Sequence, residues 1–129
     1  MVLTLPTMNI AGRPFLNGRL ECDDLRLYDD VRFFLDPTAE HSFVTTKALR
    51  TSPLPREILG AKFRTHVPLP QGTLEEYEIT FRRLRVVEYT ENKPLPSTFG
   101  RDFLSVCPMV TVEGQVIVQM KDYKIAVNQ

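Results

Sequence analysis

The sequence predicts a single, mostly β domain that spans residues 1–129. Ten prolines and six glycines are spread along the chain, and both residue types favour turns between short elements. Several segments alternate apolar and polar side chains, which is the pattern of strands with one buried face. No long segment repeats apolar side chains at the spacing of an amphipathic helix. We therefore expect short strands joined by turns, with little helix.

The first half of the chain predicts a buried strand followed by an irregular segment. Apolar and polar side chains alternate over residues 31–35, so this strand has a buried face, and it ends at Asp36. Residues 45–59 contain two prolines that interrupt any regular element, apart from a helical turn expected around residues 47–50. The acid at Asp36 is thus delivered by a strand and followed by loop structure.

A hairpin is predicted next. Residues 63–68 form its first strand, residues 70–72 its turn, and the return strand begins at Leu74. The apolar alternation of the return strand changes phase by one residue near residues 82–83. This slip indicates a β-bulge or a corner at that point.

A short helix is predicted to begin at Gly100 and to end before Pro108, because proline cannot continue a helix. Phe103, Leu104 and Val106 are expected to face the core from this helix. A loop over residues 92–97 precedes this helix.

The last part of the chain predicts a second hairpin, over residues 109–112 and 115–120, and a terminal strand over residues 123–127. Both ends of the chain are apolar, at residues 2–5 and 125–127. These ends could interleave with those of a second copy as an intermolecular sheet, or they could pair within the chain.

The composition limits the function classes. Sixteen basic residues balance sixteen acidic ones, so no overall field attracts nucleic acid or an anionic membrane, and we expect neither partner. No apolar run approaches the roughly 20 residues of a membrane helix, and no signal peptide is recognisable, so we expect a cytoplasmic or otherwise intracellular protein. Cys22 and Cys107 are far apart in sequence and are expected to be reduced packing thiols rather than a disulfide.

Two motifs carry the functional information. Residues 33–44 read Phe-Phe-Leu-Asp-Pro-Thr-Ala-Glu-His-Ser-Phe-Val, so an apolar run delivers one carboxylate, Asp36, into a tight turn of small residues. An isolated aspartate at this position usually caps a turn. About sixty residues later, residues 98–104 read Thr-Phe-Gly-Arg-Asp-Phe-Leu. The pair of motifs makes a functional interpretation of Asp36 stronger than either motif would alone.

In order and separation, the two motifs resemble those of the retropepsins, the retroviral-type aspartic peptidases. That family has two hydrophobic residues, Asp, Thr or Ser, Gly and Ala at the first site, and a hydrophobic residue, Gly, Arg, Asp or Asn, a hydrophobic residue and Leu at the second. The resemblance covers residues from about 13 to 120. It implies a small closed β-barrel of the retropepsin (acid protease) type with one short helix near the C-terminus.

The resemblance also implies a function, that of a homodimeric aspartic endopeptidase without metal or cofactor. Each chain would supply one catalytic acid, Asp36, because the chemistry needs two acids that share a proton. A peptide or protein substrate would bind in an extended form under the hairpin, which would act as a flap. The residues implied to contact substrate are Thr38 and Ala39 in the active loop and Gln71, Gly72 and Thr73 in the flap.

A structural role is implied for three further residues. Gly100 opens the helix beneath the active loop, and Arg101 is expected to form an ion pair with Glu40, four positions beyond the catalytic acid. If that ion pair is buried, replacing either partner should destabilise the fold.

The first motif departs from the family at two positions. Pro37 has neither the hydroxyl nor the N–H of the Thr or Ser that braces the two active loops against each other. Thr38 replaces a glycine, and its β-branched side chain is expected to disfavour a glycine-like backbone. Activity is therefore expected to be weak or absent. The alternative is a non-catalytic dimerisation or peptide-binding module with the same fold.

Other sites are disfavoured. His41 and Ser42 lie near Asp36 in sequence, but neighbours along a strand point to opposite faces, which argues against a nucleophilic triad. His66 is the other histidine, and without clustered cysteines no zinc site is expected. The arginines within residues 82–85 are flanked by glutamates, so a solvated strand face is favoured over an RNA-binding surface.

Overall fold

The computed structural model describes residues 2–128, which form eleven strands and one short α-helix, α1 (Arg101–Leu104). The strands are β1 (Leu3–Pro6), β2 (Met8–Ile10), β3 (Arg13–Cys22), β4 (Leu27–Leu35), β5 (Phe43–Thr45), β6 (Glu57–Pro68), β7 (Leu74–Val87), β8 (Thr98–Phe99), β9 (Met109–Val112), β10 (Gln115–Met120) and β11 (Lys124–Val127). Two 3-10 turns lie at Asp23–Leu25 and Thr46–Ala48. Within residues 2–128, no helix has the length and apolar character needed to cross a membrane.

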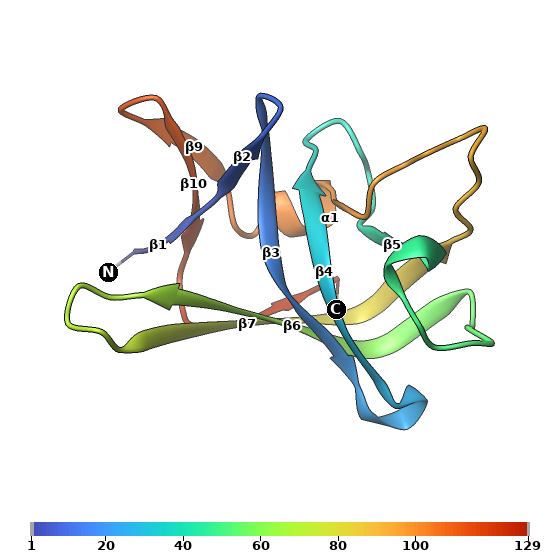
Figure 1. The fold of residues 1–129 in the computed structure, drawn as a ribbon. Helices are drawn as coiled ribbons and strands as arrows, with labels where there is room; N and C mark the ends of the chain where they lie inside the picture. Colours follow the sequence, from blue (N-terminus) through green and yellow to red (C-terminus); the bar gives the residue numbers. More distant parts are fainter. Residues whose placement is uncertain (1, 129) are drawn as a thin grey trace.

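Six strands close into a barrel, in the order β3, β4, β8, β5, β7 and β6, with β6 paired back to β3 (Figure 1). Antiparallel pairing dominates, but β4 and β8 run parallel, as do β5 and β7. The prediction of a mostly β chain with a closed barrel and one short helix is confirmed.

The short strand β8 lies between β4 and β5, although it follows them by more than fifty residues. Phe34 of β4 is opposite Thr98, and Thr98 is in turn opposite Phe43 of β5. The chain between β4 and β5 must therefore cross over the end of β8. This crossing brings the loop after Asp36 against the start of α1 at Gly100.

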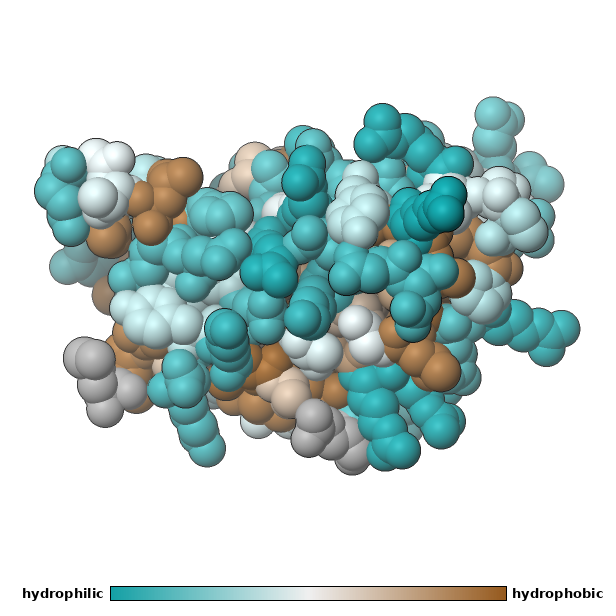
Figure 2. Space-filling view, turned by 90° about the horizontal axis from the view of Figure 1, so that it is seen from below, coloured by the Kyte–Doolittle hydropathy of each residue, from teal (hydrophilic) through white to brown (hydrophobic). Residues whose placement is uncertain are grey.

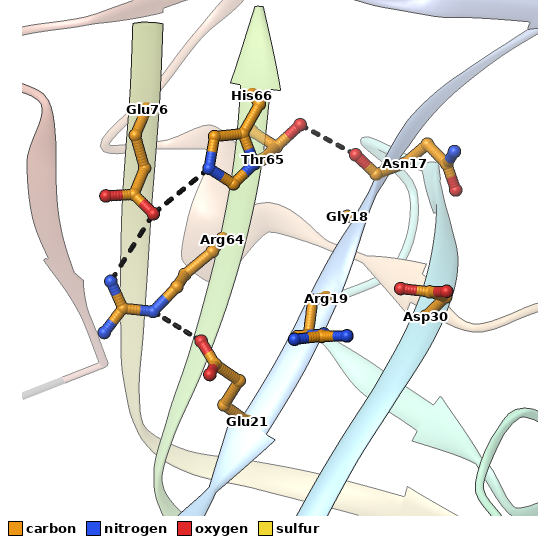
Figure 3. A pocket seen from close by; sticks show the side chains of 9 residues that line it. All are labelled: Asn17, Gly18, Arg19, Glu21, Asp30, Arg64, Thr65, His66 and Glu76. Atoms are coloured by element: carbon orange, nitrogen blue, oxygen red, sulfur yellow. Dashed lines mark hydrogen bonds and ion pairs between the residues drawn. The ribbon is translucent and has the colours of Figure 1, made fainter. Parts of the chain in front are cut away.

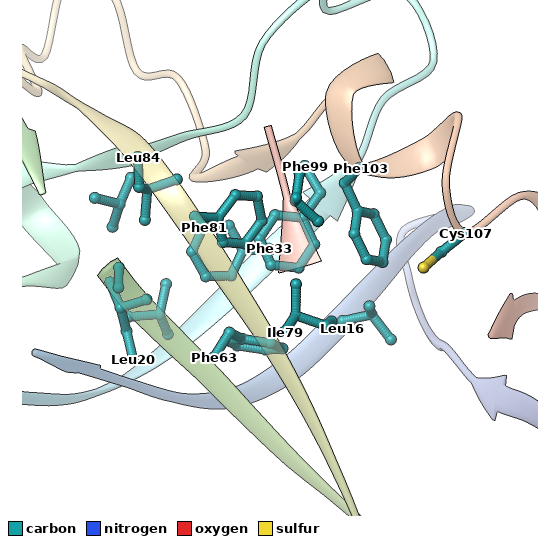
Figure 4. Packing of buried hydrophobic residues seen from close by; sticks show 14 of the residues in the cluster. Leu16, Leu20, Phe33, Phe63, Ile79, Phe81, Leu84, Phe99, Phe103 and Cys107 are labelled. Carbon is teal, nitrogen blue, oxygen red and sulfur yellow. The ribbon is translucent and has the colours of Figure 1, made fainter. Parts of the chain in front are cut away.

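The core of the barrel is aromatic at its centre (Figure 4). The rings of Phe33 and Phe99 stack with centroids 4.1 Å apart, and Phe63 meets both rings edge-on at 5.2 Å. Phe81 and Phe103 pack on Phe99 from either side of this group. All five side chains are fully buried, so β8 is fixed between its neighbours by packing as well as by its hydrogen bonds.

Both ends of the chain pair within the chain. β1 is antiparallel to β10, and with β9 these strands form a separate three-stranded sheet. β11 is parallel to β7, with Ile125 opposite Ile79. Of the two arrangements considered for the apolar ends, the structure shows the pairing within one chain.

Most element predictions are confirmed, including both hairpins and the helix that begins after Gly100. The proposed bulge is wrong, because β6 and β7 keep one register on both sides of residues 82–83. Gly60 has φ +69° and lies between Leu59, which is opposite Arg83, and Ala61, which is opposite Phe81, so the change of phase is a corner at a left-handed glycine. Val106 is exposed rather than inward-facing, since the helix has already ended there. Cys22 and Cys107 are buried and free.

The irregular segment before β6 is held to the barrel by one ion pair. The Nε atom of Arg50 lies 2.8 Å from Oδ1 of Asp29, whose side chain is buried on β4. The neighbouring carboxylate raises the pKa of Arg50. This contact gives Asp29 the partner that a buried charge requires.

The surface seen from below is mostly hydrophilic, with hydrophobic side chains in separate small areas (Figure 2). Among the large apolar side chains, Leu59 and Leu74 have the highest exposed fractions, at 65% and 63%. They belong to different strands, near opposite ends of the long hairpin. These two exposed side chains therefore do not form one apolar area with each other.

Two tyrosines share one carboxylate where β7 meets the turn before β11. The hydroxyl of Tyr77 donates to Glu75, and the hydroxyl of Tyr123 donates to the other oxygen of the same carboxylate at 2.9 Å. The pKa of Tyr77 is raised mainly by burial and to a smaller extent by its hydrogen bond to Glu75. The pKa of Tyr123 is raised mainly by its hydrogen bond to Glu75. Both phenols are thus held in their neutral form.

We expect this cluster to make stability fall steeply at alkaline pH. The pKa of each phenol is higher in the folded state than its unfolded value of about 10. The stabilisation that the two neutral phenols give the folded state is therefore complete below about pH 10. It is lost as the pH rises towards their folded-state pKa values. Urea unfolding of the wild type and Tyr77→Phe between pH 8 and pH 11.5 measures this. The wild-type midpoint should fall more steeply above pH 10. If the urea midpoints of the two proteins fell equally with pH, the prediction would be contradicted.

Candidate functional site

Asp36 is the first residue after β4, and it is held in a tight turn. Its backbone N–H donates to the carbonyl of Phe99 at 3.0 Å, which extends the pairing of β4 with β8 by one residue. Its carbonyl accepts from the N–H of Ala39 at 3.2 Å and closes the turn. The side chain is half-buried. The carboxylate therefore sits at the end of the barrel on a backbone fixed from both sides.

Thr38 holds the carboxylate of Asp36. Its hydroxyl donates to Oδ1 of Asp36 at 2.6 Å, and its backbone N–H donates to the same oxygen at 2.9 Å. Thr38 is not among the residues with positive φ, so this turn does not require a glycine-like backbone. The expectation that Thr38 would strain the turn is wrong, because its N–H reaches the carboxylate with ordinary geometry.

Gly100 allows residues 37–42 to lie directly on the start of α1. These residues form the loop that the resemblance implies is the active loop, and we keep that name for them. A Cβ atom at this position would lie 2.6 Å from the carbonyl oxygen of Ala39 and 2.9 Å from that of His41, and both contacts are with backbone. The N–H of Arg101 donates to the same Ala39 carbonyl at 2.8 Å. The predicted structural role of Gly100 thus has a steric basis in the crossing of the two segments.

Ser42 and Asp102 form a second link between the active loop and α1. The buried Ser42 hydroxyl donates to Oδ1 of Asp102 at 2.6 Å and accepts from the N–H of Gly100 at 3.0 Å. The N–H of Ser42 also donates to Asp102, at 3.1 Å. Sequence reasoning missed this pair, although the acid directly after the Gly-Arg of the second motif was a signal that could have found it.

We expect Asp102→Ala to destabilise the fold by about 2–4 kcal/mol, because it leaves the N–H and hydroxyl of the buried Ser42 without an acceptor. Urea unfolding measures the loss, and hydrogen exchange at the Ser42 amide should become faster. Asp102→Asn keeps one acceptor oxygen and should lose less. Equal losses for the alanine and asparagine variants would show that these hydrogen bonds contribute little.

The expected ion pair between Arg101 and Glu40 is absent within residues 2–128. Both side chains are exposed, and the Glu40 carboxylate instead lies 3.8 Å from Nε2 of His41. The backbone N–H of Arg101 and the side chain of Asp102 supply the contacts that join the two motifs. Hydrogen bonds to the active loop therefore replace the predicted ion pair.

The structure does not bring the predicted flap residues to Asp36. Gln71, Gly72 and Thr73 lie in the turn of the β6–β7 hairpin, at the left edge of Figure 1, whereas the active loop is at the upper end of β4. The turn is closed by the N–H of Leu69, which donates to the carbonyl of Thr73 at 2.8 Å. Within one chain, Asp36 is thus near Thr38 and Ala39 but not near the hairpin turn.

Among five cavities on the described residues, the one with the largest volume, about 540 Å³, lies on the outer face of β3 and β6 (Figure 3). Most of its charged groups are paired with one another, and Arg19 and Asp30 are the two that form no ion pair among the described residues. Arg64 contacts the carboxylate of Glu21, and it lies 3.1 Å from that of Glu78 and 3.6 Å from that of Glu76. These neighbouring carboxylates raise the pKa of Arg64 against the opposing effect of burial. The network favours a structural role for this face.

Asp36 is not among the residues that line these five cavities. Among residues 2–128, no three His, Cys, Asp or Glu side chains are grouped so that they could hold a metal ion. No protein-family model, no curated protein and no solved structure matches the chain at a significant level. The functional interpretation therefore depends on the geometry of the Asp36 loop.

Proposed function

We propose that this chain is a retropepsin-like aspartic peptidase domain that acts as a homodimer, with Asp36 as the acid of each protomer. The observation that supports this most is the crossing of two loops at the end of the barrel. β8 lies between β4 and β5, so the turn that carries Asp36 rests directly on Gly100. The order of the two sequence motifs agrees with this arrangement.

The proposed chemistry explains why one chain is insufficient. Peptide hydrolysis by carboxylates needs one ionised and one protonated acid around a water molecule. The ionised group takes a proton as the water oxygen attacks the carbonyl carbon, and the protonated group gives its proton to the nitrogen as the C–N bond breaks. Two ionised carboxylates about 4 Å apart repel by roughly 4 kcal/mol at an effective dielectric constant of 20, which keeps one of them protonated. A twofold axis beside Asp36 would supply this pair.

The proposed substrate is a peptide or protein segment that binds in an extended form beside the active loop. In the dimer, the hairpin turn with Gln71, Gly72 and Thr73 could cover that segment only if the partner subunit's turn reaches the loop, because the turn of the same chain does not. Ala39 remains a candidate contact, since it is next to the carboxylate along the turn.

The second candidate is a non-catalytic dimerisation or peptide-binding module, and Pro37 favours it. Pro37 has no N–H and no hydroxyl, so the active loop lacks a group at this position that could brace it against a second copy. A pair of carboxylates misplaced by about 1 Å can lose roughly 100-fold in rate. The same fold could then bind peptides without cleaving them.

The two candidates are separated by pepstatin, an inhibitor of aspartic peptidases. If two Asp36 carboxylates form the site, pepstatin should raise the melting temperature of the wild type, because a ligand of the native state stabilises it. Asp36→Asn should lose this shift. Asp30→Asn, at an exposed position on β4, the strand that ends just before Asp36, is the matched control and should keep it. A shift that is absent from the wild type, or unchanged in Asp36→Asn, would argue against the peptidase.

Restoring the brace tests the role of Pro37. Pro37→Thr returns a hydroxyl and an N–H to the loop and leaves both hydrogen bonds of Thr38 in place. Cleavage of a peptide library at mildly acidic pH should increase in this variant and disappear when Asp36→Asn is added. Efficient cleavage by the wild type, lost in Asp36→Asn, would show that Pro37 does not impair the site.

A further inference from the structure

We infer that Thr38 is the positioning residue of the site: it holds Oδ1 of Asp36 from within the same loop and leaves Oδ2 as the oxygen that acts on substrate. This inference rests on the proposed function for its catalytic meaning. The geometry that carries it is present in a single chain.

Thr38 offers two donors to the Asp36 carboxylate. The hydroxyl and the backbone N–H of Thr38 donate to one oxygen of Asp36, at 2.6 Å and 2.9 Å. Two donors from one residue restrict both the rotamer of the Asp36 side chain and the rotation of its carboxylate plane. With one donor alone, the carboxylate group could still rotate about that single hydrogen bond.

The rest of the turn offers the carboxylate no further side-chain contact. Pro37 and Ala39 carry no side-chain donor, so Thr38 is the one residue of the turn after Asp36 whose side chain can hold the carboxylate. Within residues 2–128, Oδ2 of Asp36 accepts no hydrogen bond. Oδ2 is therefore the oxygen available to a water molecule, a substrate or a second Asp36.

The contact with Thr38 gains importance because Pro37 has no group that could brace the loop against a second copy. A brace between two protomers would order the carboxylates only after dimerisation, whereas the contact with Thr38 orders each carboxylate beforehand. Preorganised groups lose less freedom when the complete site forms. The threonine thus compensates within one chain for a contact that Pro37 cannot make with another.

The test uses the full chain and three variants. Thr38→Val keeps the side-chain shape and the backbone N–H but removes the hydroxyl, whereas Thr38→Ser keeps a hydroxyl. Thr111→Val changes an exposed threonine on β9 and is the matched control. Three-bond couplings between Hα and the two Hβ protons of Asp36, measured by NMR, report its side-chain rotamer. Thr38 is exposed, so all variants are expected to fold, and Thr38→Ala serves as a second variant if the valine distorts the turn.

We expect two unequal couplings, which indicate one rotamer, in the wild type, in Thr38→Ser and in Thr111→Val. Averaged, nearly equal couplings are expected in Thr38→Val and Thr38→Ala. If the wild type cleaves peptides, Thr38→Val should lower kcat by roughly tenfold or more with little change in KM, and Thr38→Ser should recover most of the loss.

The outcomes separate the two proposals. Unchanged Asp36 couplings in Thr38→Val and Thr38→Ala would overturn the positioning role whether or not the protein cleaves peptides. Averaged couplings in those variants, together with a wild type that neither cleaves peptides nor responds to pepstatin, would support the positioning role and overturn the peptidase.

Discussion

Gly100→Ala is expected to destabilise the protein by at least about 3 kcal/mol, at the upper end of what overpacking a core costs. The added Cβ would lie 2.6 Å and 2.9 Å from the carbonyl oxygens of Ala39 and His41. Both are backbone atoms, so no side chain can rotate away, and the whole loop after Asp36 would have to move. Urea unfolding measures the loss, and pepstatin should no longer shift the melting temperature of any variant that remains folded.

Gly72→Ala is the matched control for this substitution. Gly72 has φ +90° and open space around it, so alanine there suffers the conformational strain of a left-handed backbone, about 1–2 kcal/mol, without a clash. If Gly100→Ala were no more destabilising than Gly72→Ala, the close contact between the active loop and α1 would not be important for the fold.

Gly18→Ala is expected to have an effect of similar size at the other side of the barrel. A Cβ on Gly18 would lie 2.4 Å from the carbonyl oxygen of Arg64 and 2.6 Å from the ring of Phe63. That ring is fully buried and is fixed edge-on against Phe33 and Phe99. The clash must therefore separate β3 from β6 or displace the aromatic core, at a cost of about 3 kcal/mol or more.

The measurement is the urea midpoint together with hydrogen exchange in the β3–β6 pairing, where Leu20 is opposite Phe63. Exchange of the Leu20 amide should become faster in Gly18→Ala. Gly114→Ala, at a turn with open space and φ +79°, is the control and should leave the Leu20 amide protected. Equal protection in both variants would mean that β3 and β6 tolerate the extra methyl group.

Much of the fold was predictable because its signals are local. The strand over residues 31–35, the hairpin with its turn at residues 70–72 and the helix after Gly100 each follow from alternation or from a turn residue. The change of phase near residues 82–83 left a bulge and a corner both open, because the left-handed residue at the corner, Gly60, is on the neighbouring strand. A change of phase in one sequence segment does not reveal which strand bends.

The contacts of the site were less predictable, since they depend on atoms that meet only after folding. The position of Asp36 at the end of a barrel strand could be read from residues 33–44. The use of Asp102 rather than Arg101 to hold the active loop could not, because both residues lie on one short turn and the choice depends on which of them faces Ser42.

By itself, the sequence determined the class of fold, the strand that ends at Asp36 and the two departures, Pro37 and Thr38, that distinguish its active loop. Turn chemistry and side-chain periodicity act over a few residues, so they can be read directly. Only the tertiary structure decided that β8 inserts between β4 and β5. It likewise decided that Thr38 holds the carboxylate and that the chain ends pair within one chain. These features join residues that packing of the barrel brings together, and no local pattern encodes their distances or directions.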